Sequence, residues 1–305
     1  MNIRRISSLT QGVLLLLPFV FLGCGDPKSL PDPKSLPPVS TKDLEEPKVE
    51  DRADKKLPSD ESLTPEEYIR LGLPAHDREW SGNDMVKAEK VLNALALKGY
   101  RYLPRYKSER SGEVFARLTS SQNLMIYTDR SLPLEVRFPQ GISFSQAGNR
   151  IFKLYCDASL KKDVGDSEIV ELMGMQLRSL AMVSGLVDEF LPTIKKDDLS
   201  YPTRMEAFER MKRDFAGVVA ANLMTLTEER HYYRVSELKR LVDCMSETYP
   251  VLIPRLPPGT LTETVIRLEK MQDDPALKDL QPGLGQLLSK VKDSLGKGIA
   301  PLPQP

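Results

Sequence analysis

The sequence is poor in the residues on which most catalytic and metal sites depend. Its 305 residues include two histidines, His76 and His231, together with three cysteines and one tryptophan. It contains no His-Glu-x-x-His, Cys-x-x-Cys or Gly-x-Ser-x-Gly motif and no glycine-rich phosphate-binding loop. The common hydrolase, zinc and nucleotide-binding mechanisms therefore lack a starting residue, and we predict no cofactor and no metal.

The net charge of the chain is close to zero. The chain has 43 basic and 43 acidic side chains, and residues 1–23 hold only two of them, Arg4 and Arg5. A protein so close to neutrality has no general attraction to nucleic acid or to anionic lipid. We therefore expect no nucleic-acid partner.

The apolar run near the N-terminus is too short to cross a membrane. It extends from Val13 to Leu22, after Arg4 and Arg5. A membrane-spanning helix needs about 20 apolar residues, whereas the hydrophobic part of a secretory signal needs only about 7–15. The pattern predicts a signal peptide over residues 1–23.

The end of this run, Val20-Phe21-Leu22-Gly23-Cys24, resembles the lipobox of bacterial lipoproteins. The resemblance implies that Cys24 becomes the first residue of the mature protein and that its thiol carries the lipid that anchors the protein to a membrane. Gly25 stands where the retention signal of enteric lipoproteins has Asp, which implies an outer membrane, facing the periplasm or the cell surface. The alternative is an ordinary secretory signal with an incidental cysteine.

Residues 24–63 have the composition of a tether. Asp-Pro-Lys-Ser-Leu-Pro occurs at 26–31 and again at 32–37, and further prolines follow among alternating charges. Few of these side chains can bury apolar surface, so we expect the segment to be disordered. About 40 residues at ~3.1 Å each would reach up to ~120 Å from the membrane. Residues 297–305 predict a disordered tail.

Residues 64–296 predict one mainly α domain, an irregular multi-helix bundle. Apolar residues recur there at three- and four-residue steps, and Ser or Thr followed three residues later by an acidic or amide residue marks several helix starts. The expected helices are 64–72, 81–99, 113–120, 143–158, 167–190, 203–224, 235–249, 260–271 and 282–296. Small residues in the helix 167–190, among them Gly174 and Gly185, suggest that a neighbouring helix approaches it closely.

One segment has some strand character. Residues 134–138 alternate apolar and polar side chains between two prolines, and residues 124–127 could pair with them as a small β-hairpin. The alternative is an extended connection between helices.

Cys156 and Cys244 remain after Cys24 is assigned to lipid. In an oxidising compartment they could form a disulfide, or they could be two buried free thiols. The sequence leaves both alternatives open.

The strongest candidate for an interaction surface is the stretch from Lys98 to Lys107. It interleaves three tyrosines with several cations, in particular Tyr100, Arg101, Tyr102, Arg105 and Tyr106. Aromatic faces flanked by charges suit contact with sugar rings or with a protein surface, so an envelope protein or a cell-wall glycan is the expected partner. The structural alternative is that these tyrosines fold back over the bundle.

Glu228 and His231 have the spacing of one half of a di-iron bundle site, but a second such pair is missing. The sequence as a whole therefore favours a lipid-anchored envelope protein that binds or scaffolds and is not an enzyme. The alternative is an enzyme or small-ligand carrier whose site is built from scattered Arg, Glu and Tyr residues.

Overall fold

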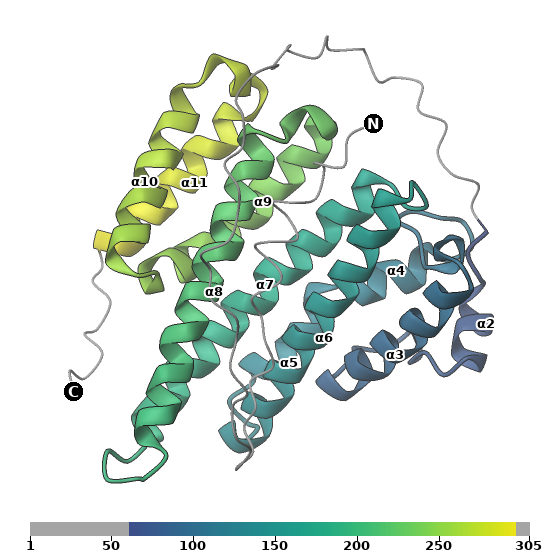
Figure 1. Ribbon diagram of the computed structural model, residues 1–305, viewed down its shortest axis with the longest axis horizontal. Helices are drawn as coiled ribbons and strands as arrows, with labels where there is room; N and C mark the ends of the chain where they lie inside the picture. Colours follow the sequence, from purple (N-terminus) through teal and green to yellow (C-terminus); the bar gives the residue numbers. More distant parts are fainter. Residues whose placement is uncertain (1–60, 297–305) are drawn as a thin grey trace, which may run out of the picture.

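The computed structural model of the protein describes residues 61–296, and these residues fold into helices joined by short turns (Figure 1). The α-helices are α2 (Pro65–Arg70), α3 (Gly82–Lys98), α4 (Gly112–Thr119), α5 (Met125–Thr128), α6 (Leu134–Leu160), α7 (Asp166–Phe190), α8 (Tyr201–Thr227), α9 (Val235–Leu252), α10 (Pro258–Asp273) and α11 (Gln281–Gly296). Short 3-10 turns lie between them: η2 (Tyr100–Tyr102), η3 (Ser121–Leu124), η4 (Leu191–Thr193), η5 (Arg230–Tyr232), η6 (Ile253–Arg255) and η7 (Pro275–Leu280). The described range contains no strand, which confirms the mainly α class.

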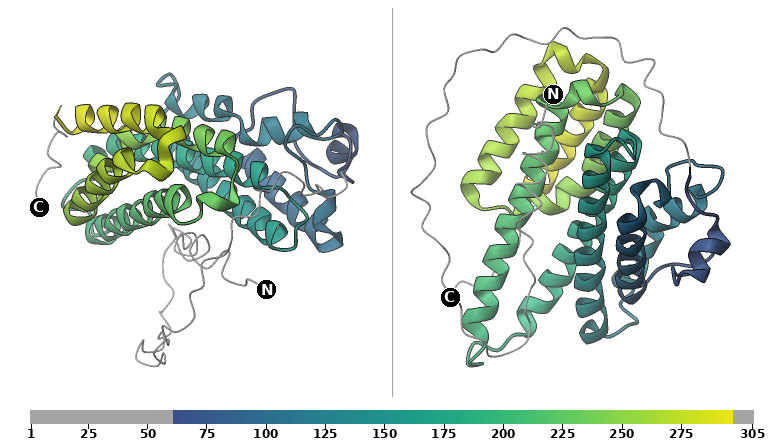
Figure 2. Two further views of the ribbon diagram at one scale, coloured as in Figure 1. Left: turned by 90° about the horizontal axis from the view of Figure 1, so that it is seen from above. Right: turned by 45° about the vertical axis from the view of Figure 1, so that its right-hand side comes forward.

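Six of the helices are arranged as a row that follows the sequence, except that α11 lies between α9 and α10. Helix α3 packs on α6, α6 on α7, α7 on α9, α9 on α11, and α11 on α10. Figure 1 shows this order as a change of colour from blue at α3 to yellow at α10 and α11, and Figure 2 shows it from two further directions. Helix α8 contacts α7, α9 and α10, whereas α4 and α5 contact α7.

Helix α7 is the central element of the row. Leu172 and Leu177 have no exposed surface, and nearly every apolar side chain of the helix is buried. With its extension to Thr193, it is the only helix among the described residues long and apolar enough to cross a membrane by length and composition. However, 78% of its most apolar window is buried inside the fold, which is the position of a core helix.

The helix starts that the sequence marks at Thr64 and Ser81 are confirmed. The Thr64 hydroxyl accepts from the Glu67 N–H and the Glu67 carboxylate accepts from the Thr64 N–H, and Ser81 and Asp84 make the same reciprocal pair. Gly72, with φ of 95°, follows α2 in a conformation that L side chains rarely adopt.

The helix starts expected at Ser143, Thr203 and Thr260 are wrong, because all three residues lie inside longer helices. The Ser143 hydroxyl donates to the Pro139 carbonyl oxygen, 2.9 Å away, instead of capping a helix end. Ser and Thr also make such bonds inside helices, so the spacing alone does not mark a helix end.

The β-hairpin and the extended connection predicted near residues 124–138 are also wrong: this segment forms η3, α5 and the first turn of α6. Arg137 is the reason, since its guanidinium is buried. It donates to the Leu132 and Tyr127 carbonyl oxygens, each at 2.9 Å, and pairs with Glu189 on α7 at 2.6 Å. Phe138 next to it stacks on Phe190, with ring centroids 4.4 Å apart. These tertiary contacts override the local alternation of residues 134–138.

Two prolines lie inside helices: Pro139 ends the segment for which the sequence favoured an extended structure, and Pro250 lies where the sequence predicted that the helix 235–249 would stop. Pro139 lies in the second turn of α6 and Pro250 in the last turn of α9. Each removes one backbone hydrogen bond near a helix end, where fewer bonds are lost than at a helix centre. The neighbouring Tyr249 and Leu252 have no exposed surface, and burial on this scale contributes about 1.5–3 kcal/mol for each side chain.

Helices approach one another closely at two glycines, one in α3 and one in α6. A Cβ atom on Gly82 would lie 2.3 Å from the Gln140 carbonyl oxygen of α6, and one on Gly141 would lie 2.6 Å from a Leu186 methyl group. By contrast, nothing lies within 4 Å of the corresponding position at Gly185. The close approach predicted at Gly185 of α7 therefore does not occur there.

Replacement of Gly82 by alanine should destabilise the fold because the clash is with backbone, which cannot turn aside. We expect Gly82→Ala to lower the free energy of unfolding by about 1–3 kcal/mol, measured by urea denaturation. Gly185→Ala is the matched control. It adds a methyl group in open space inside a helix, so it should leave stability unchanged or raise it by up to about 1 kcal/mol. Equal stability of the two variants would contradict the packing described for α3 and α6.

The predicted signal peptide, Cys24, most of the tether and the tail 297–305 lie outside the described residues.

Candidate functional site

The residues predicted as an interaction surface lie together in the connection between α3 and α4, and the structure adds cations from two other elements. We define the tyrosine–cation cluster by eight residues, Tyr100, Arg101, Tyr102, Arg105, Tyr106, Lys107, Lys161 and Arg240. Lys161 follows α6 and Arg240 is on α9. The cluster therefore joins three parts of the chain near the N-terminal end of α7.

Each tyrosine ring of the cluster has a cation over its face. The Lys161 Nζ atom lies 4.8 Å from the centroid of Tyr100, and the Arg101 guanidinium lies 5.0 Å from that of Tyr102. Tyr106 has two such neighbours, with the Arg240 guanidinium at 4.7 Å and the Lys107 Nζ atom at 5.2 Å. Cations at these distances are attracted by the ring electrons, and each contact contributes about 0.5–1 kcal/mol at exposed sites.

The cluster is attached firmly to the helices beneath it. All three tyrosines are partly buried against the core, as the structural alternative predicts. The Tyr68 hydroxyl donates to the Tyr102 carbonyl oxygen at 2.7 Å, and the Tyr106 N–H donates to a Glu168 carboxylate oxygen at 2.9 Å. Arg240 also donates to the Tyr106 hydroxyl. The exposed parts of the rings and cations are thus presented by a supported surface.

The cations of the cluster are only partly neutralised. Arg101 pairs with Glu61 at 3.2 Å, and Arg240 pairs with Glu171 at 2.9 Å. No described carboxylate lies within 4.0 Å of the charged nitrogens of Lys107, Lys161 or Arg105.

Arg105 has the least ordinary environment in the cluster. Only 7% of its surface is exposed, yet its Nε and Nη2 atoms have no hydrogen-bond partner. Burial of these two nitrogens without an acceptor is costly, because they have lost their hydrogen bonds to water.

The arrangement suits acidic partners better than flat sugar rings. Stacking on a sugar needs an open aromatic face, whereas here a cation already covers a face of every tyrosine. The exposed ammonium groups of Lys107 and Lys161 can instead bind carboxylates. The local sequence pattern shows residues 100–107 as a candidate, but it gives no sign of Lys161 or Arg240, which lie far away along the chain.

Cys156 and Cys244 are both buried and free in the structure. Cys156 is on α6 and Cys244 is on α9, where its Sγ atom donates to the Gly174 carbonyl oxygen of α7 at 3.4 Å. Burial raises the pKa of each thiol to about 12, so both stay protonated near neutral pH. Such thiols behave as small apolar side chains and not as nucleophiles.

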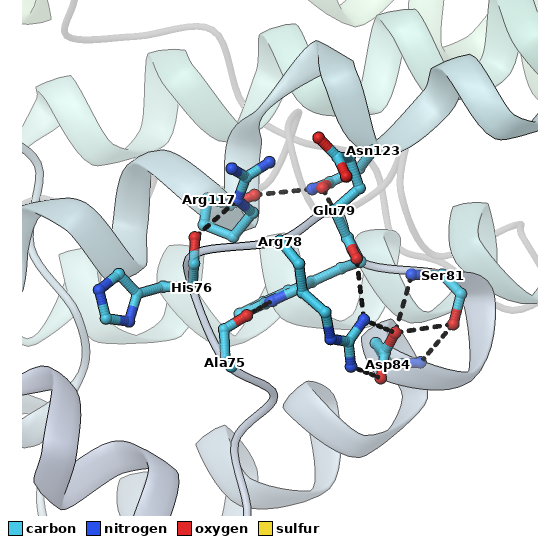
Figure 3. A network of polar contacts seen from close by, with 9 residues as sticks. Ala75, His76, Arg78, Glu79, Ser81, Asp84, Arg117 and Asn123 are labelled. Carbon is cyan, nitrogen blue, oxygen red and sulfur yellow. Dashed lines mark hydrogen bonds and ion pairs between the residues drawn. The ribbon is translucent and has the colours of Figure 1, made fainter.

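A second group of polar residues surrounds the connection between α2 and α3 (Figure 3). The Trp80 N–H donates to Asn123 at 2.8 Å, and Asn123 donates to the Arg117 carbonyl oxygen at 2.6 Å. Arg117 in turn donates to the His76 carbonyl oxygen at 2.9 Å. These bonds run mostly to backbone atoms, so the network fixes the path of this connection over the buried Trp80.

Figure 3 also shows Asp84 at the start of α3, held by Arg78 and Ser81. Arg78 donates two bonds to the carboxylate, at 2.9 and 3.0 Å, while the Ser81 N–H and hydroxyl donate to it at 3.0 and 2.8 Å. Burial by itself raises the pKa of this carboxyl, but these hydrogen bonds outweigh burial and lower the pKa from 3.8 to about 2.

The lowered pKa of Asp84 makes stability depend on pH. A depressed carboxyl pKa stabilises the fold above its unfolded value near 4, and this contribution, about 2 kcal/mol, is lost as pH falls toward 2. We expect Asp84→Asn to lower the free energy of unfolding by about 2 kcal/mol at pH 7 and to make little further difference at pH 2. Urea denaturation from pH 2 to pH 7 measures this, with Asp279→Asn at an exposed carboxylate as control. A constant difference across this range would contradict the assignment.

The Glu228–His231 spacing does not assemble a metal site. Glu228 pairs with Arg267 at 3.3 Å, and the His231 ring lies against Tyr232. Within residues 61–296, no group of three or more His, Cys, Asp or Glu side chains is placed to hold a metal ion. Thr225, three residues before Glu228, donates to the Ala221 carbonyl oxygen inside α8.

No protein-family model, curated protein or solved structure matched the chain in sequence and structure comparisons, so its function has to be inferred from its own residues.

Proposed function

We propose that this protein is a lipid-anchored protein of the bacterial envelope whose helical domain binds an acidic partner through the tyrosine–cation cluster. Two features of the sequence support the anchor, the short apolar run after Arg4 and Arg5 and the Gly23-Cys24 pair that ends it. Residues 24–63 then connect the lipid to the helical domain.

The observation that carries the binding proposal is the incomplete neutralisation of the cluster. Lys107 and Lys161 are exposed cations held over partly buried tyrosines, and neither is paired with a described carboxylate. Aromatic residues and arginine are enriched in the centres of protein interfaces, while charges at the rim guide encounter and set specificity. A supported surface of this kind also loses little conformational entropy when it binds.

The partner class follows from the charges. An acidic surface of an envelope protein, or a cell-wall polymer that carries carboxylates, would complete the ion pairs that the cluster lacks. Because these pairs are exposed, binding should weaken with salt, as the screening length falls to about 8 Å at 0.15 M.

Charge reversal at the two lysines tests the binding proposal and leaves the contacts of the tyrosines with the core in place. We expect the double variant Lys107→Glu/Lys161→Glu to recover the partner about tenfold less well, which corresponds to ~1.4 kcal/mol. The measurement is a quantitative pull-down from an envelope extract, together with sedimentation on purified peptidoglycan.

The matched control is Lys195→Glu/Lys290→Glu, which reverses two exposed charges elsewhere. Lys195 follows the C-terminal end of α7, whereas the cluster lies near the N-terminal end of this helix, which is about 36 Å long. Circular dichroism checks that both double variants are folded. Equal recovery by the two folded variants would rule out the cluster as the binding surface.

A further inference from the structure

The described chain begins on the cluster itself. Glu61 pairs with Arg101 at 3.2 Å, and Ser62 has no exposed surface. The Ser111 hydroxyl donates to the Ser62 oxygen at 2.8 Å and accepts from the Arg105 N–H at 2.9 Å. The point at which the N-terminal segment enters the domain is therefore fixed against the same residues that form the candidate site.

The sequence that precedes this point is acidic in sum, since residues 43–60 carry seven acidic and four basic side chains, with Lys55 and Lys56 directly after Asp54. Residues 43–54 contain Asp43, Glu45, Glu46, Glu50, Asp51 and Asp54, against two cations, Lys48 and Arg52. The charge of this segment is thus opposite to the uncompensated charge of the cluster.

The chain between the two is long enough to bring them together. Six residues lie between Asp54 and Glu61, and the seven steps along the chain at ~3.3 Å each span up to ~23 Å. A short connection of this kind holds the segment at an effective concentration on the order of millimolar near the cluster. Weak exposed ion pairs, which contribute about 0.2–1 kcal/mol each, become significant when several form at once under these conditions.

We propose that the acidic segment 43–54 docks on the tyrosine–cation cluster of its own chain. Its carboxylates bind the exposed ammonium groups of Lys107 and Lys161.

This docking would regulate the function proposed above, and that consequence rests on the proposed function. The segment and an acidic partner would compete for the same cations, so a partner binds only as it displaces the segment. Removal of the acidic charges from the segment should then increase partner binding several-fold.

Zero-length carbodiimide cross-linking of the full mature chain, followed by peptide mass spectrometry, tests the docking without knowledge of the partner. This reagent joins a carboxylate directly to an amine in contact with it. We expect Lys107 and Lys161 to be linked to carboxylates of residues 43–54, and the links to be lost at 1 M salt, where the screening length is about 3 Å. Lys195 and Lys290 serve as internal controls and should not be linked to this segment.

Two comparisons separate the remaining outcomes. A mixture of isotopically light and heavy chains distinguishes links within one chain from links between two copies, and links only between copies would overturn the proposal. The variant Glu45→Gln/Glu46→Gln/Glu50→Gln/Asp51→Asn should lose the links to Lys107 and Lys161. Equal linking of the segment to all four lysines, or no linking to the cluster, would also overturn it.

The partner measurement then reports separately on regulation. If the links form but the neutralised variant recovers no more partner than the wild type, the segment docks without regulating and the regulatory part is wrong. The lysine-reversal variants test the proposed function itself, so failure of that function is recognised independently.

Discussion

The burial of α7 between α6 and α9 is the interaction on which the other elements depend. Leu172 and Leu177 lose all contact with solvent there, and full burial of a leucine contributes about 1.5–3 kcal/mol. Helix α3 packs on α6. Helix α11 packs on α9, and α10 packs on α11. The two ends of the chain are thus connected through α7, and loss of its packing would separate the N-terminal helices from the C-terminal ones.

The same helix places the candidate site. Glu168 and Glu171, in the first two turns of α7, contact Tyr106 and Arg240. The connection from α3 to α4 is therefore bound to α7 through Glu168. Helix α9 contributes Arg240, whose guanidinium lies over the Tyr106 ring. This explains how residues from distant parts of the chain form one supported surface, which is the property that the proposed binding function requires.

The sequence predicted the helical class and the centres of most helices, because their apolar residues recur with the helical period. It failed where tertiary contacts decide the local structure. Arg137 and Phe138 are buried by contacts with Glu189 and Phe190 of α7, so a segment that alternates like a strand becomes helical. The spacing that marks a real cap at Thr64 also occurs inside helices at Thr203, and no local rule separates the two.

The candidate site was accessible to sequence reasoning only in part. The interleaved tyrosines and cations of residues 100–107 can be recognised from the sequence. Arg240, however, contacts Tyr106 from a position 134 residues further along the chain, and no sequence pattern around Arg240 predicts this contact. The state of Cys156 and Cys244 was likewise undecided, since it depends on the relative positions of α6 and α9.

The central claim of this account is that Cys24 anchors the domain to an envelope membrane, and metabolic labelling with a fatty-acid probe tests it most directly. We expect the wild type and the control variant Cys156→Ser/Cys244→Ser to be labelled equally and to sediment with membranes. We expect Cys24→Ser to be unlabelled and soluble after export. Labelling of Cys24→Ser at the wild-type level would contradict the account.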